Sequence, residues 1–223
     1  MPGFKTRNVK VTIGGDSYLL RILSDKQQVS DLEGHRKRLH ISSAQWGLFG
    51  QLWPSGQLLA QAMCRFEISG KRVLQLSCGI GLASIVLMRH GVEVIACDEH
   101  PLAEPFLAHN AALNGLPPVQ FHQLRHGRDP SALGAFDLII ASDVLHDRSQ
   151  AEFIADVVLH HAKPRAEVVI TDPGLSSSEE FSRMLVKQSF VLKSTRCRMH
   201  DSDPEPYRGQ LLHYSRNMMI ATT

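Results

Sequence analysis

The clearest chemical signal in the sequence is a pair of glycines followed, one apolar run later, by an aspartate. Gly79 and Gly81 come directly after a short apolar run, and Asp98 ends the next one. Glycines let a ligand approach the backbone closely, and the start of a following helix offers unpaired N–H groups to an anion. A carboxylate at the end of the next strand can accept hydrogen bonds from both hydroxyls of a ribose. These residues therefore predict a nucleoside-binding turn.

The spacing of small residues in this turn favours S-adenosylmethionine over NAD as the ligand. A dinucleotide-binding turn has the pattern G-x-G-x-x-G, in which the third glycine allows close helix packing. Here Ser77, Gly79 and Gly81 stand at every second position instead. A glycine turn by itself also occurs in α/β crossovers that bind nothing, so the prediction needs support from other strand ends.

A second group of polar residues, Ser142, Asp143 and His146, follows the apolar run at residues 136–141. A carboxylate and a histidine at the end of a strand could bind a ligand and exchange protons with it. Asp143 could instead cap the next helix. We favour the catalytic role because open parallel sheets bind ligands at the ends of their strands.

The elements that hold these residues are those of a parallel α/β sheet. Apolar strands at residues 73–76 and 92–97 flank an apolar helix at residues 82–90. The run at residues 136–141 is wholly apolar, as in a strand that is covered on both faces. Further strands are expected at residues 119–124, 167–171, 190–198 and 211–221, and further helices at residues 57–66, 101–113, 151–161 and 178–187.

Five alternating units followed by an antiparallel pair predict an α/β fold. We expect a Rossmann-like, seven-stranded open sheet with helices on both faces and an antiparallel last strand. Residues 8–13 and 18–23 alternate apolar and polar side chains around a Gly-Gly-Asp turn, which predicts a β-hairpin ahead of the main fold. The polar residues 24–44 are interpreted as a linker. We therefore divide the chain into a hairpin and linker at residues 1–45 and a main domain at residues 46–223.

The tripeptide Trp53-Pro54-Ser55 precedes the helix expected at residues 57–66. Proline suits a first helical turn and serine is a frequent cap, so Ser55 is predicted to cap this helix. The indole of Trp53 would then point at whatever lies over the helix start. The alternative is that Trp53 packs the helix on the sheet.

Size and composition narrow the classes of function. A chain of 223 residues suits one domain, and a net charge of +2 with a pI near 8.4 gives no reason to expect nucleic acid as a partner. Four scattered cysteines predict reduced thiols and a cytoplasmic location. We expect no metal site, because His160 and His161 are adjacent on a helix and point in different directions. No apolar window long enough for a membrane span is found, nor a secretory signal, and we expect a monomer.

Taken together, these residues resemble the seven-β-strand S-adenosylmethionine-dependent methyltransferases. Within them, the chain resembles the group of non-histone protein-lysine methyltransferases related to nicotinamide N-methyltransferase. Four motifs in order carry the resemblance: Trp53-Pro54-Ser55-Gly56 resembles W-P-x-[AGS], residues 75–81 the glycine motif, Asp98 the ribose-binding acid, and residues 143–146 the motif D-x-x-[YF]. The resemblance runs from the leading hairpin to the last strand, and it identifies residues 46–223 as a methyltransferase domain.

The resemblance implies a role for each residue of a cofactor site. Asp98 would bind the ribose of S-adenosylmethionine, and Asp143 would face the acceptor amine, with His146 beside it. S-adenosylhomocysteine would be the product. The remaining positions implied for the cofactor site are Trp53 packing on the cofactor, Ser77, Cys78 and Gly79 around its methionine part, His126 beside the adenine, Ser142 beside the sulfonium, and Gln75, Gly81 and Glu99 in the same motifs.

The sequence departs from the family pattern at four of these positions. Gln75 replaces an acidic residue, and Ser77 replaces a glycine, which is acceptable only if that position does not need a positive φ. His126 and His146 replace larger aromatic residues. The substitution at His146 bears on the acceptor, because the aromatic residue of this motif is expected to shape the amine channel.

The predicted function is S-adenosylmethionine-dependent N-methylation of a lysine side chain in a protein substrate. The loop at residues 201–209, with Asp201, Asp203 and Glu205, is mildly acidic and suits a basic segment. Two alternatives remain open. The protein could methylate a small molecule or an arginine or histidine side chain, or it could be a homologue that binds the cofactor without catalysing transfer.

Overall fold

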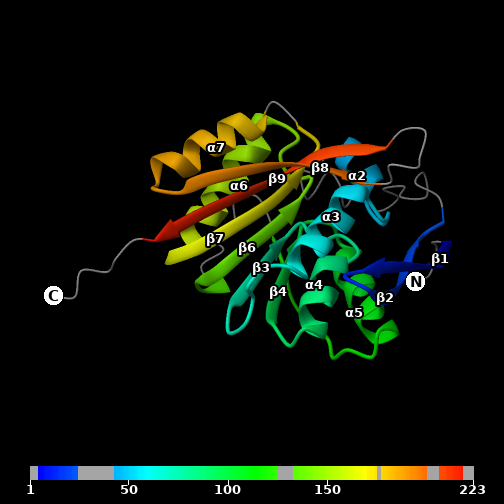
Figure 1. Ribbon diagram of the computed structural model, residues 1–223. Coiled ribbons are helices and arrows are strands. Elements are labelled where there is room, and N and C mark those ends of the chain that lie inside the picture. Colours follow the sequence, from blue (N-terminus) through cyan, green and yellow to red (C-terminus); the bar gives the residue numbers. More distant parts are fainter. Residues whose placement is uncertain (1–4, 25–42, 125–132, 175–176, 200–205, 218–223) are drawn as a thin grey trace.

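A single seven-stranded sheet forms the centre of the protein (Figure 1). The computed structural model describes residues 5–24, 43–124, 133–174, 177–199 and 206–217. In spatial order the strands are β5 (Gln120–Gln123), β4 (Glu93–Asp98), β3 (Arg72–Leu76), β6 (Phe136–Ser142), β7 (Ala162–Asp172), β9 (Tyr207–Asn217) and β8 (Val191–Met199).

The strand order reverses at β3, which pairs in parallel with β4 on one side and with β6 on the other. Strand β9 is inserted between β7 and β8 and runs antiparallel to both. The predicted seven-stranded sheet with an antiparallel last strand is therefore confirmed. Its insertion brings the first residues of β9 back to the edge where β6 and β7 end, since Asp172 pairs with Gln210.

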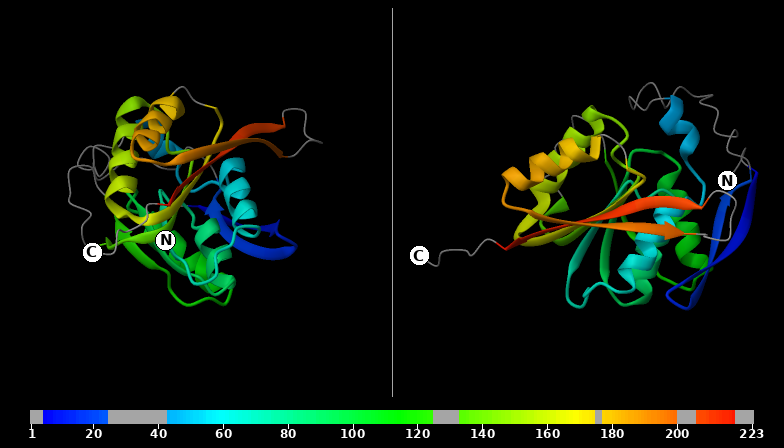
Figure 2. Two further views of the ribbon diagram at one scale, coloured as in Figure 1. Left: turned by 60° about the vertical axis from the view of Figure 1, so that its left-hand side comes forward. Right: turned by 45° about the horizontal axis from the view of Figure 1, so that its top comes forward.

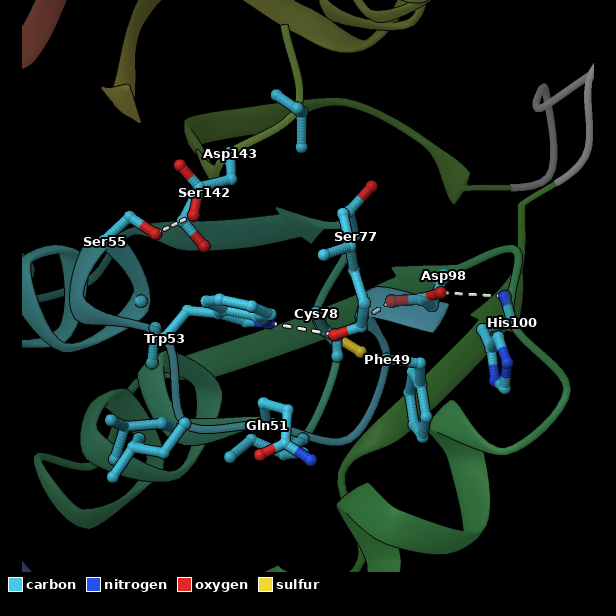
Figure 3. Close-up of a pocket in the computed structure, with 18 of the residues that line it drawn as sticks. Phe49, Gln51, Trp53, Ser55, Ser77, Cys78, Asp98, His100, Ser142 and Asp143 are labelled. Atoms are coloured by element: carbon cyan, nitrogen blue, oxygen red, sulfur yellow. Dashed lines mark hydrogen bonds between the residues drawn. The ribbon is translucent and has the colours of Figure 1, made fainter. Parts of the chain in front are cut away.

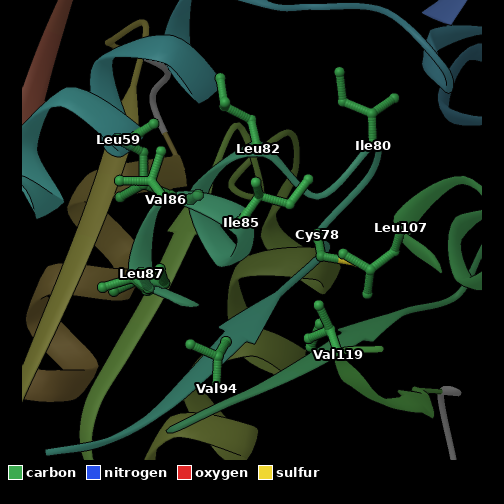
Figure 4. Close-up of a cluster of buried hydrophobic side chains, with 14 of the residues drawn as sticks. Leu59, Cys78, Ile80, Leu82, Ile85, Val86, Leu87, Val94, Leu107 and Val119 are labelled. Carbon is green, nitrogen blue, oxygen red and sulfur yellow. The ribbon is translucent and has the colours of Figure 1, made fainter. Parts of the chain in front are cut away.

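Helices cover both faces of the sheet (Figure 2). The helices α3 (Pro54–Met63), α4 (Leu82–Arg89) and α5 (Ala103–Leu113) contribute to one apolar core, and α6 (Arg148–His161) and α7 (Ser177–Lys187) to the other. In β6, Leu138 and Ile140 enter the first core, whereas Ile139 enters the second. Figure 4 shows part of the first core. Because side chains alternate between the faces, a strand covered on both sides has to be apolar throughout.

The N-terminal hairpin, β1 (Thr6–Ile13) and β2 (Asp16–Leu23), packs beside α5. Asn110 of α5 accepts a hydrogen bond from the backbone N–H of Arg21 at 2.7 Å and donates to the carbonyl of Ile80 at 2.9 Å. Asn114 accepts from the N–H of Leu19 at 3.0 Å. The edge of the hairpin is therefore joined to the helix and, through Asn110, to the glycine turn.

One short helix was missed and one local prediction is wrong. The short helix α2 (Ser43–Leu48) was not expected, because its sequence lacks the period of a helix long enough to detect. The predicted cap Ser55 does not cap α3, which begins at Pro54 with Trp53 at the cap position and no side-chain cap bond. Ser55 is buried within the first turn instead. Among the described residues, no helix combines the length and the apolar character that crossing a membrane requires.

Candidate active site

A cavity of about 600 Å³ opens at the edge where β3, β4 and β6 end (Figure 3). It lies at the reversal of strand order, where open α/β sheets bind ligands. Ten of the predicted site residues line it: Trp53, Gln75, Ser77, Cys78, Gly79, Asp98, Glu99, Ser142, Asp143 and His146. Gly81 does not line the cavity, and His126 falls outside the described residues.

The turn after β3 is built from three residues with positive φ: Ser77 at 49°, Gly79 at 55° and Gly81 at 86°. Ser77 therefore occupies the left-handed conformation that it was expected to avoid, at a cost of about 1–2 kcal/mol. Only the positive φ favours glycine at position 79, because no heavy atom lies within 4 Å of a Cβ placed there. The backbone at Gly79 is consequently open to the cavity.

Gly81 acts in packing rather than in ligand contact. A Cβ at Gly81 would lie 2.2 Å from Cδ1 of Leu107, so its glycine lets α4 and α5 approach. Gln75, which replaces the acid of the family motif, is buried and accepts a hydrogen bond from the Ser84 hydroxyl at 2.5 Å. This bond ties β3 to α4 directly beneath the turn.

Asp98 is held by backbone donors at the other side of the turn. One carboxylate oxygen accepts from the N–H of Gly79 and the other from the N–H of His100, each at 2.8 Å. Burial raises the pKa of Asp98, while the N–H groups of His100, Gly79 and Glu99 lower it. Each carboxylate oxygen has two lone pairs, so Asp98 can still accept hydrogen bonds from ribose hydroxyls.

Asp143 lies at the opposite end of the cavity (Figure 3). Its backbone, at φ 52°, donates to the carbonyl of Thr171 at 3.0 Å, and its carboxylate accepts a hydrogen bond from the Ser55 hydroxyl. Burial and the nearby charge of Asp172 raise the pKa of Asp143 to about 7. The helix cap is Asp147, which accepts from the N–H of Gln150 at 2.9 Å, so Asp143 does not cap α6.

The indole of Trp53 borders the cavity and is partly exposed, which does not fit a core position. Its Nε1 donates to the carbonyl of Leu48 at 2.9 Å, and this bond orients the ring at the start of α3. His146 is exposed at the rim of the cavity, where it can exchange protons with solvent.

The lining residues that were not predicted as site residues include Phe49, His100 and Tyr207. The rings of Phe49 and His100 stack with centroids 4.0 Å apart, and burial lowers the pKa of His100 to about 3. His100 is therefore neutral at physiological pH. Its position directly after Asp98 and Glu99 was a signal that could have been used, whereas the placement of Tyr207 follows only from the sheet order.

No group of three or more histidine, cysteine, aspartate or glutamate side chains that could hold a metal ion occurs in the part of the chain that the structure describes. The four cysteines are free, with Cys78 and Cys97 buried. Burial raises the pKa of Cys97 to about 12, so its thiol stays protonated. The acid–base groups that line the cavity beside the glycine turn are the carboxyls of Asp98, Glu99 and Asp143, the neutral His100, His146 and the phenol of Tyr207.

Solved structures with the same fold include methyltransferases. The ribosomal protein L11 methylase from Lactobacillus delbrueckii subsp. bulgaricus matches with a TM-score of 0.61 and 21% identity, covering 77% of this chain and 82% of that one. The 16S rRNA N2 G1207 methyltransferase of T. Thermophilus, solved with AdoMet and guanosine, matches with a TM-score of 0.64 and 17% identity, covering 97% of this chain and 52% of that one. At these identities the likeness shows the fold alone.

Curated relatives are similar over part of the chain. The electron transfer flavoprotein beta subunit lysine methyltransferase of Xenopus laevis is 31% identical over 58% of this chain, and the match spans about half of that protein (52%). The human histone-arginine methyltransferase METTL23 is 28% identical over 69% of this chain and 86% of its own length. A family model described as lysine methyltransferase matches residues 35–187. The chain therefore belongs to the lysine methyltransferase family.

Proposed function

We propose that the protein transfers a methyl group from S-adenosylmethionine to the side-chain nitrogen of a lysine in another protein. The observation that carries this proposal is one cavity with two different ends, the turn at Gly79 with Asp98 at one and the partly buried carboxyl of Asp143 at the other. Family membership and the similarity to a flavoprotein lysine methyltransferase support the same acceptor.

The residues at the Asp98 end fit the nucleoside part of S-adenosylmethionine. A cavity of about 600 Å³ is within the range of ~300–1,000 Å³ that small-molecule sites occupy. Asp98 would accept hydrogen bonds from the ribose, the open backbone at Gly79 would allow close approach, and Trp53 would cover the cofactor. When bound, S-adenosylmethionine supplies an electrophilic methyl group on a sulfonium.

Asp143 would act on the acceptor. A lysine that enters the cavity loses hydration, which lowers its pKa, and a carboxylate beside it favours binding of the cation. The lysine ammonium has to lose a proton before the nitrogen has a lone pair that can attack. Because its own pKa lies near 7, the Asp143 carboxyl can hold that proton briefly, and His146 at the rim can pass it to solvent. Asp143 then stabilises the methylated ammonium.

The proposal is tested by incubating the protein with tritiated-methyl S-adenosylmethionine and a cell lysate. A labelled protein band is expected, and amino-acid analysis of that band is expected to give methyl-lysine. Asp143→Asn should lower labelling about 100-fold or more, within the range that positioned acid–base groups contribute. Asp147→Asn is the matched control, because Asp147 caps α6 and does not line the cavity.

Two results would reject the assignment. Full labelling by Asp143→Asn would show that Asp143 is not catalytic. Label found only in a small molecule would exclude a protein acceptor.

Arginine is the second candidate acceptor. The relative that matches over most of its own length, 86%, is a histone-arginine methyltransferase. The exposed His146 has a smaller ring than the aromatic residue of the family motif, and it would leave more room for a guanidinium, which is wider than an ammonium. The same amino-acid analysis distinguishes the two acceptors, since methyl-arginine in the labelled band would show that the acceptor is arginine and not lysine.

A further inference from the structure

Tyr207 places a phenol beside the acceptor end of the cavity. It is the first residue of β9, and it lines the cavity although it lies more than sixty positions from Asp143 in the sequence. Its hydroxyl oxygen is buried and makes no hydrogen bond to any of the residues that the structure describes. A buried polar atom without a partner costs about 1–3 kcal/mol, so this oxygen calls for a ligand.

The orientation of the phenol is set by Gly209. A Cβ at Gly209 would lie 2.6 Å from the Tyr207 hydroxyl oxygen and 2.8 Å from Cζ. Residues two apart in a strand share a face, so the ring of Tyr207 folds along β9 over the space that a side chain at Gly209 would fill. Gly209 has an ordinary strand conformation, and its glycine therefore serves the ring rather than the backbone.

The neighbours of the phenol are the groups that hold Asp143. Ser55 lies close enough to lower the pKa of Tyr207, but its single proton is donated to Asp143, which leaves none for the phenolic oxygen. Burial raises the pKa of Tyr207 strongly, and the charges of Asp143 and Asp172 raise it further. The phenol is therefore neutral, and its oxygen keeps lone pairs that can accept a hydrogen bond.

We propose that Tyr207 is a specificity-determining residue that, together with Asp143, binds the two N–H groups of a primary amine, so that the first methyl transfer is favoured over the second. This inference rests on the proposed function. The Asp143 carboxylate accepts one N–H and the Tyr207 hydroxyl oxygen accepts the other. With both N–H groups held, the lone pair of the nitrogen is free to face the methyl group.

The transfer exchanges one bond to the methyl carbon for another. The nitrogen lone pair forms the new N–C bond while the S–C bond breaks, and the electron pair of the broken bond remains on sulfur in S-adenosylhomocysteine. The methylammonium then releases one proton to solvent. A monomethylated amine has one N–H instead of two, and its methyl group would have to take the place of the hydrogen bond to Tyr207. The second transfer therefore loses one hydrogen bond and meets the phenol as an obstacle.

The first test measures binding to the protein saturated with S-adenosylhomocysteine. The probes are n-butylamine, N-methylbutylamine and N,N-dimethylbutylamine at pH 8, and their binding is measured by ligand-observed NMR. In solution the three are ammonium ions of similar pKa, so each releases one proton to solvent when it binds as the neutral amine, and this cost is nearly the same for all three. For the unmodified protein, affinity should fall about fivefold to tenfold from the first probe to the second and again to the third. Tyr207→Phe, which removes only the hydroxyl, should reduce the first step to less than twofold.

Two further variants separate this role from a structural one. Gly209→Ala should have the same effect as Tyr207→Phe, because its Cβ displaces the phenol without removing it. Tyr214→Phe should keep the preference for n-butylamine, since Tyr214 is a buried phenol of the same strand that lies 2.8 Å from the Ser182 hydroxyl and does not line the cavity. Thermal unfolding of each variant checks that it is folded.

Failure of this inference can be distinguished from failure of the proposed function. No binding of n-butylamine, or an unchanged preference in Tyr207→Phe, overturns the inference even when S-adenosylhomocysteine binds and transfer occurs. Failure to bind S-adenosylhomocysteine rejects the proposed function instead. A second readout is the product on the labelled lysate protein. Mass spectrometry should show mainly monomethylation by the unmodified protein and a dimethyl-to-monomethyl ratio about fivefold higher for Tyr207→Phe.

Discussion

Asp143 is a residue whose backbone and charge are both unfavourable in the free protein. Its φ of 52° lies in the left-handed region, and burial together with the charge of Asp172 raises its pKa to about 7. Such costs concentrate at sites where function requires a particular arrangement. A cation that binds beside Asp143 stabilises its charged form, so binding of the acceptor offsets part of this cost.

Asp143→Asn should make the free protein more stable at pH 8. The pKa of Asp143 is about 7 in the folded state and 3.8 in the reference state, so the folded state binds more protons between these values. The free energy of unfolding therefore falls as the pH rises through this window. Asparagine tolerates the left-handed conformation and removes the charge.

Urea unfolding of both proteins at pH 5 and pH 8 measures this difference. The gain in the variant should be on the order of 2 kcal/mol larger at pH 8 than at pH 5. An equal gain at the two pH values would show that the carboxyl is not buried as described.

Ser77→Gly should stabilise the protein by about 0.5–1 kcal/mol. Glycine removes the strain of the left-handed conformation at φ 49°, less the entropy that glycine loses on folding. Ser77→Ala is the matched control, because it removes the hydroxyl but keeps the Cβ. Thermal and urea unfolding measure both variants, and a similar gain in Ser77→Ala would mean that the hydroxyl, and not the backbone, is responsible.

At the scale of elements, the approach of α4 and α5 depends on one missing side chain. Gly81 and Gly91 both have a positive φ, at 86° and 74°, but only Gly81 faces a neighbour, since a Cβ added there would lie 2.2 Å from Cδ1 of Leu107. Leu107 is buried in the core, so it cannot move aside without disturbing its contacts.

Gly81→Ala should therefore cost about 1–3 kcal/mol more than Gly91→Ala. Both variants pay the cost of a left-handed conformation, about 1–2 kcal/mol, and only the first adds a steric conflict. The free energy of unfolding in urea compares the two. Equal costs would indicate that α4 and α5 are not in close contact at this position.

Elements with a strong local signal were predicted and those that depend on distant partners were not. The strand–turn–helix–strand unit from β3 to β4 and the apolar strand β6 follow from apolar runs and glycines in their own sequence. Helix α2 has six residues, which is too short for its period to be recognised. Ser55 was assigned to a cap by local rules, whereas its bond to Asp143 depends on how α3 lies against β6.

At the scale of the whole molecule, the sheet order determines which residues share the cavity. Asp98 and Asp143 could be placed from the sequence, because the ends of parallel strands meet at one edge. Tyr207 could not, since its place depends on the insertion of β9 between β7 and β8. The positive φ of Ser77 was equally hidden, because the residue type favours other conformations.

The central claim is that the turn at Gly79 and the carboxylate of Asp98 bind S-adenosylmethionine. Calorimetric titration with S-adenosylhomocysteine, the unreactive product, tests it most directly. The unmodified protein should bind one equivalent, Asp98→Ala should weaken binding at least tenfold, and Asp143→Asn should change it less than threefold. The claim is contradicted if the unmodified protein does not bind this nucleoside, or if Asp98→Ala binds it as tightly as the unmodified protein does.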